Sequence, residues 1–155
     1  MSVYQQAKGS IVLKTIIVLL VGVLIWVLYE PYQVREREEY CKKESRIRLQ
    51  NIRTAQLRYI ENHGRYADSI ATLVDFIKQS LASDTTWSAS MFKPLLSGAF
   101  VPESLLNSPK SWKPYAITAV DTTAIKKYLV EDPDGYGSIG SLTDDSKINK
   151  ASWED

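Results

Sequence analysis

The stretch that decides the fold is Ile11–Tyr29, IVLKTIIVLLVGVLIWVLY, here called the apolar segment. Only Lys14, Thr15 and Gly22 interrupt its run of apolar and aromatic residues. At 1.5 Å per residue, a helix of this length spans about 28 Å, which matches the hydrocarbon core of a bilayer. The apolar segment therefore predicts a single transmembrane helix.

The two ends of the apolar segment suit the two faces of a bilayer. Lys14 lies one turn from the start, where its stem can reach the headgroups. Trp26, Tyr29 and Tyr32 cluster at the other end, as in an interfacial aromatic belt. A cleaved signal peptide is the alternative, but no small-x-small cleavage site follows, so we expect a retained anchor.

Charge near the anchor predicts its orientation. The tail, residues 1–10, carries Lys8 and no acidic residue. Basic residues in short tails favour the cytoplasmic side of a membrane. We therefore expect a cytoplasmic N-terminus and an extracytoplasmic domain after the anchor.

Composition limits the function of the remaining chain. The 155 residues include 19 basic and 18 acidic ones, and the net charge of +1 argues against a nucleic-acid binder. A single cysteine, Cys41, excludes an internal disulfide and a cysteine-based zinc site. A single histidine, His63, excludes a metal motif built from several histidines.

Residues 30–63 predict a stalk helix that continues the anchor. There is no Gly or Pro between Tyr32 and His63, and Gly64 then supplies a stop. With residues 10–63 helical, the rod would measure roughly 80 Å, and Pro31 should kink it. Acid–base pairs at four-residue spacing support this helix: Glu38 with Lys42, Glu39 with Lys43, and Glu44 with Arg48.

The stalk changes character along its length. Residues 33–46 are almost wholly polar, which predicts a part that is solvated or packs on neighbours through charge. From Ile47 onward an apolar stripe with helical spacing follows, formed by Leu49, Ile52, Ala55, Gln56, Tyr59 and Ile60. This stripe should pack on the globular part, residues 64–155.

The globular part predicts one helix and an antiparallel sheet. Asp68 is a candidate N-cap for a helix to about Leu81, with Ile70, Leu73, Val74, Ile77 and Leu81 on its apolar face. Residues 82–113 predict an irregular loop region. Strands are expected at Tyr115–Val120, Lys127–Glu131 and Tyr136–Ile139, with a turn at Asp132–Gly135 and a polar tail that closes on Trp153. The fold class expected is α+β.

This layout resembles the type IV pilin and type II secretion pseudopilin superfamily. Lys8-Gly9 precedes the apolar helix, and Pro31 falls twenty-one residues after Ser10, a distance common in pilins. Residues Ile52–Tyr59, followed by Asn62-His63-Gly64-Arg65-Tyr66-Ala67, are similar to the stretch that ends the long pseudopilin helix.

The resemblance implies processing and assembly. Prepilins are cut after such a glycine, here between Gly9 and Ser10, and assemble through the N-terminal helix with copies or with other envelope membrane proteins. It implies a bacterial inner-membrane location with a periplasmic C-terminal domain. Two positions depart from the pattern: Ser10 replaces an aromatic residue, and Lys14 replaces a glutamate thought to pair with a neighbouring N-terminal amine.

The acidic turn is the candidate metal site. Asp132 and Asp134, joined by Asp144, or by Asp145 or Asp121, supply carboxylates around a glycine turn, which suits calcium. Some pseudopilins have a C-terminal calcium loop of this kind. EF-hand spacing is absent, and the simpler interpretation is a capped turn on an acidic surface.

Other singular residues have structural interpretations. His63 should complement the dipole at its helix end, and Cys41 should be a tolerated thiol, with an intermolecular disulfide or lipid attachment as alternatives. The glycines of Gly135–Gly140 should permit a tight turn rather than bind a nucleotide. The tryptophans should be core or partner contacts: Trp87, Trp112 and Trp153. The basic run should be a solvated helix face or a surface for an acidic partner, for example a neighbouring subunit's C-terminal segment; its members are Arg46, Arg48, Arg53 and Arg58.

No pattern joins a nucleophile, a base and an oxyanion site, so we expect no enzyme and no cofactor. The leading hypothesis is a pilin-like structural subunit whose partners are the lipid bilayer and envelope membrane proteins or copies of itself. The alternatives are an accessory single-pass subunit of a membrane enzyme complex and a small-ligand or calcium sensor.

Overall fold

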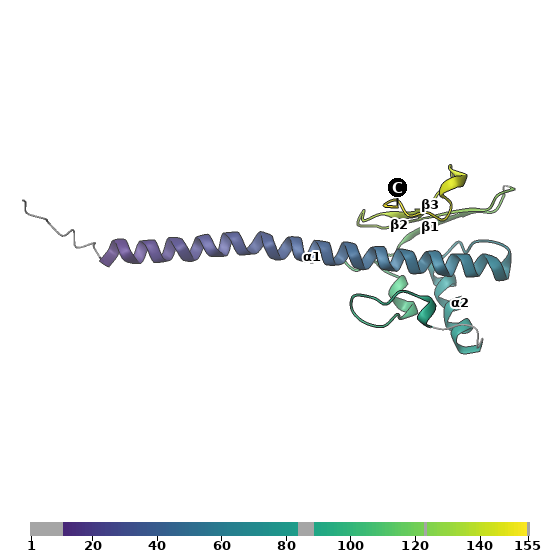
Figure 1. The fold of residues 1–155 in the computed structure, drawn as a ribbon, viewed down its shortest axis with the longest axis horizontal. Coiled ribbons are helices and arrows are strands. Elements are labelled where there is room, and N and C mark those ends of the chain that lie inside the picture. The colour runs from purple at the N-terminus through teal and green to yellow at the C-terminus, as the bar shows by residue number, and fades with distance from the viewer. Residues whose placement is uncertain (1–10, 84–88, 123, 155) are drawn as a thin grey trace, which may run out of the picture. The chain divides into compact units, whose positions relative to one another are not determined.

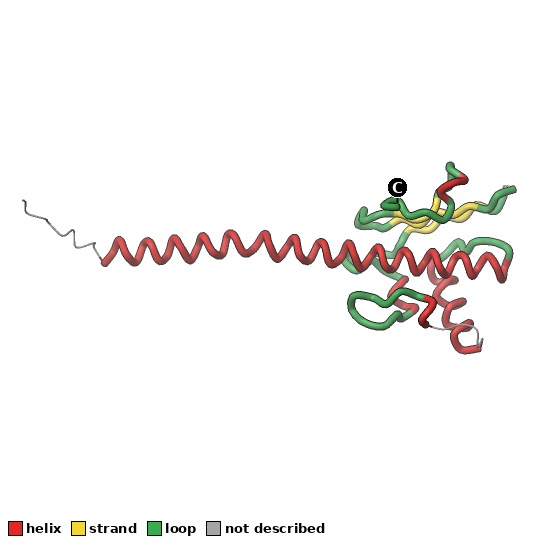
Figure 2. The backbone as a smooth tube through the Cα atoms, viewed as in Figure 1, coloured by secondary structure: helices red, strands yellow, loops and turns green. Residues whose placement is uncertain are grey.

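The computed structural model describes residues 11–83, 89–122 and 124–154, and its class is α+β, as the sequence predicts. The main elements are helices α1 (Ile11–His63) and α2 (Ile70–Ser83) and strands β1 (Ala116–Val120), β2 (Lys127–Glu131) and β3 (Ser138–Gly140) (Figures 1 and 2). Three short 3-10 helices complete them: η1 (Ala89–Met91), η2 (Pro102–Leu105) and η3 (Asp145–Lys147). The chain divides after Glu39 into two compact units, and the second, Tyr40–Asp155, is here called the head.

The first unit contains the α1 residues from Ile11 to Glu39. The sequence predicts a helix here, and the structure confirms it. The helix continues past Pro31, which lies inside α1. Proline has no N–H to donate to the carbonyl four residues earlier, that of Val27, so one helical hydrogen bond is lost at this point.

The head is built around the α1 residues from Tyr40 to His63. The predicted stripe is confirmed, because Leu49, Ile52 and Ala55 are fully buried and Tyr59 nearly so. The helix ends where predicted, since Gly64 adopts a φ of 67° and its N–H bonds to the carbonyl of Ile60 at 2.8 Å. This half of α1 is the centre of the core rather than an outer support.

Of the two alternatives for residues 33–46, solvation or packing through charge, the C-terminal end follows the second. Cys41, Glu44 and Ser45 are buried, and the head begins at Tyr40, inside the polar part of the predicted stalk. Glu44 accepts the N–H of Leu96 and Ser45 donates to the carboxylate of Asp132, so both side chains are satisfied without water.

Helix α2 packs its apolar face into the same core. Ile70, Leu73, Val74 and Ile77 are buried, as their spacing predicts. The helix begins at Ile70, so Ser69 rather than Asp68 flanks it, and the Ser69 carbonyl accepts the N–H of Leu73 at 3.2 Å. Figure 1 shows α2 on one side of the head's part of α1 and the sheet on the other.

The segment between α2 and the sheet is more ordered than the sequence suggests. It contains η1 and η2, and it buries Phe92, Phe100 and Leu105 in the core. The rings of Phe92 and Phe100 stack with centroids 4.2 Å apart. Trp87 lies outside the described residues.

The three strands form an antiparallel sheet in the order β1-β2-β3. In its register, Val130 of β2 faces Ile117 on one side and Ile139 on the other. The predicted β2 is confirmed to the residue, whereas β1 starts one residue later and β3 begins at Ser138 rather than Tyr136. Residues 132–137 take up the turn, in which the N–H of Gly135 bonds to the Asp132 carbonyl at 3.1 Å.

Candidate functional site

The apolar segment is an uncovered surface in the first unit. Every large apolar side chain between Ile11 and Tyr29 is at least 47% exposed, and no neighbouring atom lies within 4 Å of the Cβ position of Gly22. The segment is long and apolar enough to cross a membrane, by length and composition. The chain is therefore compatible with single-pass membrane anchoring.

The predicted membrane residues are all exposed on this helix. Lys14 and Gly22 lie within the apolar segment, Trp26 is 70% exposed near its end, and Pro31 follows two residues after it. The predicted processing site, Gly9 and Ser10, lies outside the described residues.

In the head, a buried ion pair joins α1 to the loop before the sheet. Glu44, only 1% exposed, accepts from Nε of Arg48 at 3.2 Å and from its Nη2 at 3.1 Å. The other Glu44 oxygen accepts the N–H of Leu96 at 2.8 Å, and Arg48 donates to the carbonyl of Asn107 at 2.8 Å. Both charged side chains therefore hold the backbone of the loop, at Leu96 and Asn107. The predicted Glu44–Arg48 pair is confirmed.

Two buried side-chain amides of α1 each bond to both backbone groups of one loop residue, as a neighbouring strand would. Asn51 donates to the carbonyl of Lys93 at 2.9 Å and accepts that residue's N–H at 2.8 Å. Gln56 makes the same pair of bonds with Ala67, both at 2.9 Å. Each amide thus satisfies both backbone groups of one residue that has no strand partner.

The sheet is tied to α1 through Asp132. Ser45 donates to the Asp132 carboxylate, and its hydroxyl also lies 2.9 Å from the hydroxyl of Tyr115. Burial raises the pKa of Tyr115, and the hydrogen bond with Ser45 opposes this only in part. The Tyr115 hydroxyl is therefore neutral across the physiological range and serves packing.

Hydrogen bonds within the head engage all three candidate calcium ligands. Asp132 accepts the N–H of Asp134 at 2.6 Å, and Asp134 accepts from the hydroxyl of Ser108 and from the N–H of Ser111. Asp144 caps η3 by accepting the N–H of Ser146 at 2.9 Å. Within the described ranges, no three His, Cys, Asp or Glu side chains form a group that could hold a metal.

Asp134 keeps its charge down to low pH. Burial alone would raise the pKa of this carboxyl, but the hydrogen bonds from Ser108 and Ser111 outweigh it, so the pKa lies below its usual value. The turn therefore holds an ionised carboxylate that fixes the loop at residues 108–111.

Two arginines of the basic run along α1, Arg46 and Arg53, contact the C-terminal part of the same chain. The interpretation as a solvated face is wrong for Arg46, which donates to the carbonyl of Tyr136 and lies 4.8 Å from the ring centroid of Trp153. It is also wrong for Arg53, which pairs with Glu154 at 2.9 Å. An acidic residue of the C-terminal segment thus pairs with Arg53 within the same chain, and a partner in a neighbouring subunit stays a prediction.

His63 and Cys41 both pack against other parts of the head. Nδ1 of His63 lies 3.2 Å from the carbonyl of Tyr59, and the His63 ring stacks on that tyrosine with centroids 4.2 Å apart. The predicted role of His63 at the helix end fits this geometry. Cys41 is a free thiol that is only 7% exposed.

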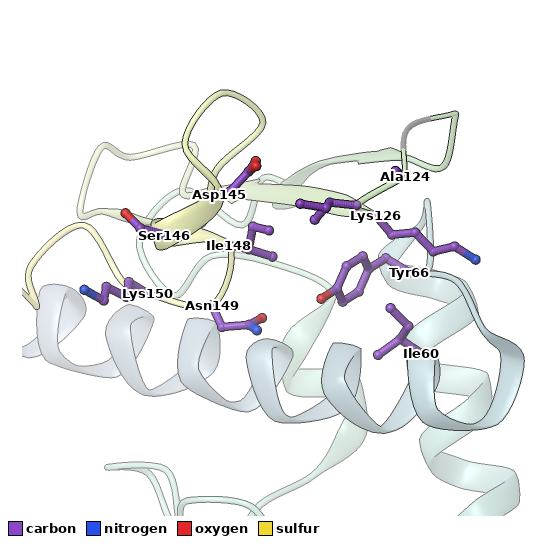
Figure 3. A pocket seen from close by; sticks show the side chains of 10 residues that line it. Ile60, Tyr66, Ala124, Lys126, Asp145, Ser146, Ile148, Asn149 and Lys150 are labelled. Carbon is purple, nitrogen blue, oxygen red and sulfur yellow. The ribbon is translucent and has the colours of Figure 1, made fainter.

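A hollow of about 550 Å³ opens on the head and is here called the head hollow. Figure 3 shows the Tyr66 ring near its centre, with Ile60 of α1 below it and Ile148, Asp145 and Ser146 around the other wall. Burial raises the pKa of Tyr66, and a hydrogen bond to Asn149 opposes this. The lining is Ile60, Tyr66, Ala124, Ile125, Lys126, Asp145, Ser146, Ile148, Asn149 and Lys150.

The sequence gives no signal for the head hollow. Its lining comes from the end of α1, the turn after it, the β1–β2 connection and the C-terminal segment, which only folding brings together. Behind it, the ring of the buried Tyr128 lies 4.5 Å from that of Tyr66, and among the described residues its hydroxyl has no hydrogen-bond partner.

Comparison with known proteins gives no relative: no family model, no curated protein and no solved structure matches this chain.

Proposed function

We propose that this protein is a non-catalytic, membrane-anchored structural subunit of a bacterial envelope assembly, similar in role to a pilin or pseudopilin. The observation that carries the proposal is the apolar segment, because its large apolar side chains are all exposed. Such a continuous apolar surface is far larger than a soluble monomer leaves uncovered. Lipid and the helices of neighbouring subunits are the natural cover for it.

The head supports a structural role. Glu44 and Asp132 hold a loop and the turn after β2 against α1, and His63 stacks on Tyr59. These interactions give a rigid body held together by buried polar contacts, which suits a part that positions contacts with other proteins.

In this proposal the anchor lies in the inner membrane, with its N-terminus in the cytoplasm and the head in the periplasm. Lys8 and Lys14 favour the cytoplasmic face for the start of the helix. The partners are lipid, together with copies of this chain or other envelope membrane proteins that pack on the apolar segment. Gly22 is the point of closest approach for a neighbouring helix, since it leaves open space on that surface.

Amine-reactive cross-linking of the full chain in intact membranes tests the proposal. We expect a ladder of oligomers or a stoichiometric envelope partner, and we expect Gly22→Ile to weaken it by filling the open surface. Val23→Ile is the matched control and should leave the ladder unchanged. A lone monomer at every expression level would contradict the proposal.

A further inference from the structure

We propose that the end of the head at which α1 enters it docks on the headgroups of the bilayer, with Trp112 as the side chain that inserts among them. This end begins at Tyr40 and is here called the tethered end. The inference rests on the proposed function, because it requires the apolar segment to lie in a membrane. The partner is a phospholipid surface that carries anionic headgroups.

The loop that carries Trp112 has the composition of an interfacial segment. Residues 108–114 read SPKSWKP, with one lysine on each side of the tryptophan and no acidic residue. Trp112 is 72% exposed, and Lys110 and Lys113 are exposed as well. An indole flanked by cations suits the membrane–water interface, where the ring lies among the headgroups and the ammonium groups meet phosphates. The flanking charges, rather than the exposure of the ring, therefore indicate lipid.

The segments on both sides of this loop contact the first residues of the head. Before the loop, the carbonyl of Asn107 accepts from Arg48 at 2.8 Å. After it, the hydroxyl of Tyr115 lies 2.9 Å from that of Ser45. Both contacts fall within the first nine residues of the head, a helical rise of about 12 Å. The loop with the indole thus belongs to the tethered end.

Two further exposed side chains add apolar surface at the tethered end. Leu96 is 47% exposed, and its N–H bonds to Glu44 at 2.8 Å. Tyr40, where the head begins, is 44% exposed. Binding to a membrane surface increases with the apolar area that is buried and with the attraction to anionic lipid. The side chains that supply both are here called the proximal patch: Tyr40, Leu96, Lys110, Trp112 and Lys113.

Hydrogen bonds within the head hold the loop in shape. The N–H of Ser108 bonds to the carbonyl of Lys113 at 2.8 Å. The carboxylate of Asp134 accepts from the hydroxyl of Ser108 and from the N–H of Ser111. It also attracts Lys110 and offsets part of that charge, so Lys113 supplies the larger share of the attraction to lipid. A loop fixed in this way loses little conformational entropy when it docks.

The chain between the apolar segment and the head is short enough to bring the proximal patch to the headgroups. Residues 30–39 separate the two, and as helix they rise by about 15 Å. The headgroup layer takes up about 5–8 Å of this rise. Transmembrane helices tilt by about 20° on average and by up to about 40°, so tilt, or a bend at Pro31, closes the remaining gap. The tether keeps the patch close to lipid, so a weak contact suffices.

Quenching of single tryptophans by brominated lipid tests the docking. Full-length chains that keep one tryptophan, with the others replaced by phenylalanine, are reconstituted at high lipid excess in equimolar phosphatidylcholine and phosphatidylglycerol. One chain keeps Trp26, which reports on the anchor, and a second keeps Trp112. The control is Ile125→Trp in a chain without the other four, because Ile125 is 48% exposed and its neighbour Lys126 bonds to Gly64, beyond the far end of α1.

Bromines on the acyl chains close to the headgroups should quench Trp26 and Trp112 about threefold more than the tryptophan at position 125. Quenching of Trp26 with no excess at Trp112 over position 125 would overturn this inference. The patch would then be left to a protein partner, and the proposed function would stand. An unquenched Trp26 would overturn both.

A charge substitution tests whether anionic lipid is the partner. Each lysine near an anionic surface strengthens binding by about fivefold. Lys110→Gln with Lys113→Gln should therefore at least halve the excess quenching of Trp112. Lys147→Gln with Lys150→Gln removes the same charge from two other exposed positions of the head and should leave the quenching unchanged. Equal quenching in both variants and in the parent chain would overturn the assignment to an anionic lipid surface.

Discussion

At the level of single residues, buried polar side chains of α1 bind the backbone of the loops that pack against the helix. Glu44, Asn51 and Gln56 are at most 1% exposed, and each bonds to backbone groups of segments that have no strand partner there. A buried backbone N–H or carbonyl without a partner costs about 1–3 kcal/mol. These side chains therefore allow irregular loops to lie against a helix without that penalty.

The buried ion pair gives the first prediction. Glu44→Ala removes the carboxylate that neutralises Arg48 and accepts the N–H of Leu96, and should lower the free energy of unfolding of the head by about 3 kcal/mol. Glu61→Ala removes the exposed pair with Arg58 and should change it by less than about 0.5 kcal/mol. Denaturant titration of the two variants in detergent checks this, and equal losses would contradict it.

The second prediction concerns pH. Because the pKa of Asp134 is lower in the folded head than its unfolded value of about 3.9, the unfolded state binds more protons at acidic pH. The stability that this carboxylate contributes is present above pH 4 and is lost as the pH falls through the folded pKa. Asp134→Asn can still accept the bonds from Ser108 and Ser111 but no longer titrates.

Thermal unfolding followed between pH 2 and pH 7 checks this behaviour. The unfolding temperature of Asp134→Asn should fall less steeply below pH 4 than that of the wild type. Glu154, whose pKa the N–H of Ala151 and then Arg53 hold low, remains in the variant, so part of the acid dependence should persist. Identical pH profiles would show that Asp134 is not a linked group.

At the level of elements, features set by local sequence could be predicted, whereas features set by tertiary contacts could not. The bounds of β2 and the end of α1 at His63 could be predicted, because alternation and a glycine stop are local signals. The burial of Glu44 and Ser45 could not, because it depends on partners about 50 and 90 residues away. The apolar segment was predictable from composition, whereas the head hollow has no local signature, because segments far apart in the sequence line it.

Gly140 gives the third prediction, on the β2–β3 pair. Its φ is 89°, and a Cβ there would lie 2.2 Å from the carbonyl oxygen of Tyr128. Gly140→Ala should therefore destabilise the head by more than about 4 kcal/mol or prevent β3 from pairing. Gly98→Ala is the matched control: its φ of 142° is also positive, but no atom lies within 4 Å, so strain of about 1 kcal/mol is expected. Chemical denaturation distinguishes the two.

At the level of the whole molecule, the chain combines an exposed apolar helix with a head held by buried polar contacts. The two units differ in their surfaces, because the apolar segment exposes its large apolar side chains whereas the head buries most of its apolar residues in a core. Changes in the apolar segment should therefore alter localisation, whereas changes in the head should alter its stability and its contacts.

The fourth prediction tests this separation. Each arginine at the centre of a membrane helix costs about 3 kcal/mol of insertion free energy. Leu20→Arg combined with Leu24→Arg should release the chain from membranes during alkaline extraction, while the control Leu20→Ile with Leu24→Ile should remain in the pellet. Equal retention of both variants would show that the apolar segment does not hold the chain in the membrane.

The most direct measurement of the central claim is the accessibility of spin labels in bilayers. Single cysteines replace Leu20 or Glu61 in a Cys41→Ser background of the full chain, and each label is exposed to oxygen, which enters lipid, and to a water-soluble nickel complex. We predict that the label at position 20 responds to oxygen and the label at position 61 responds to nickel. A nickel response at position 20 as strong as that at position 61 would contradict the membrane anchor and the role built on it.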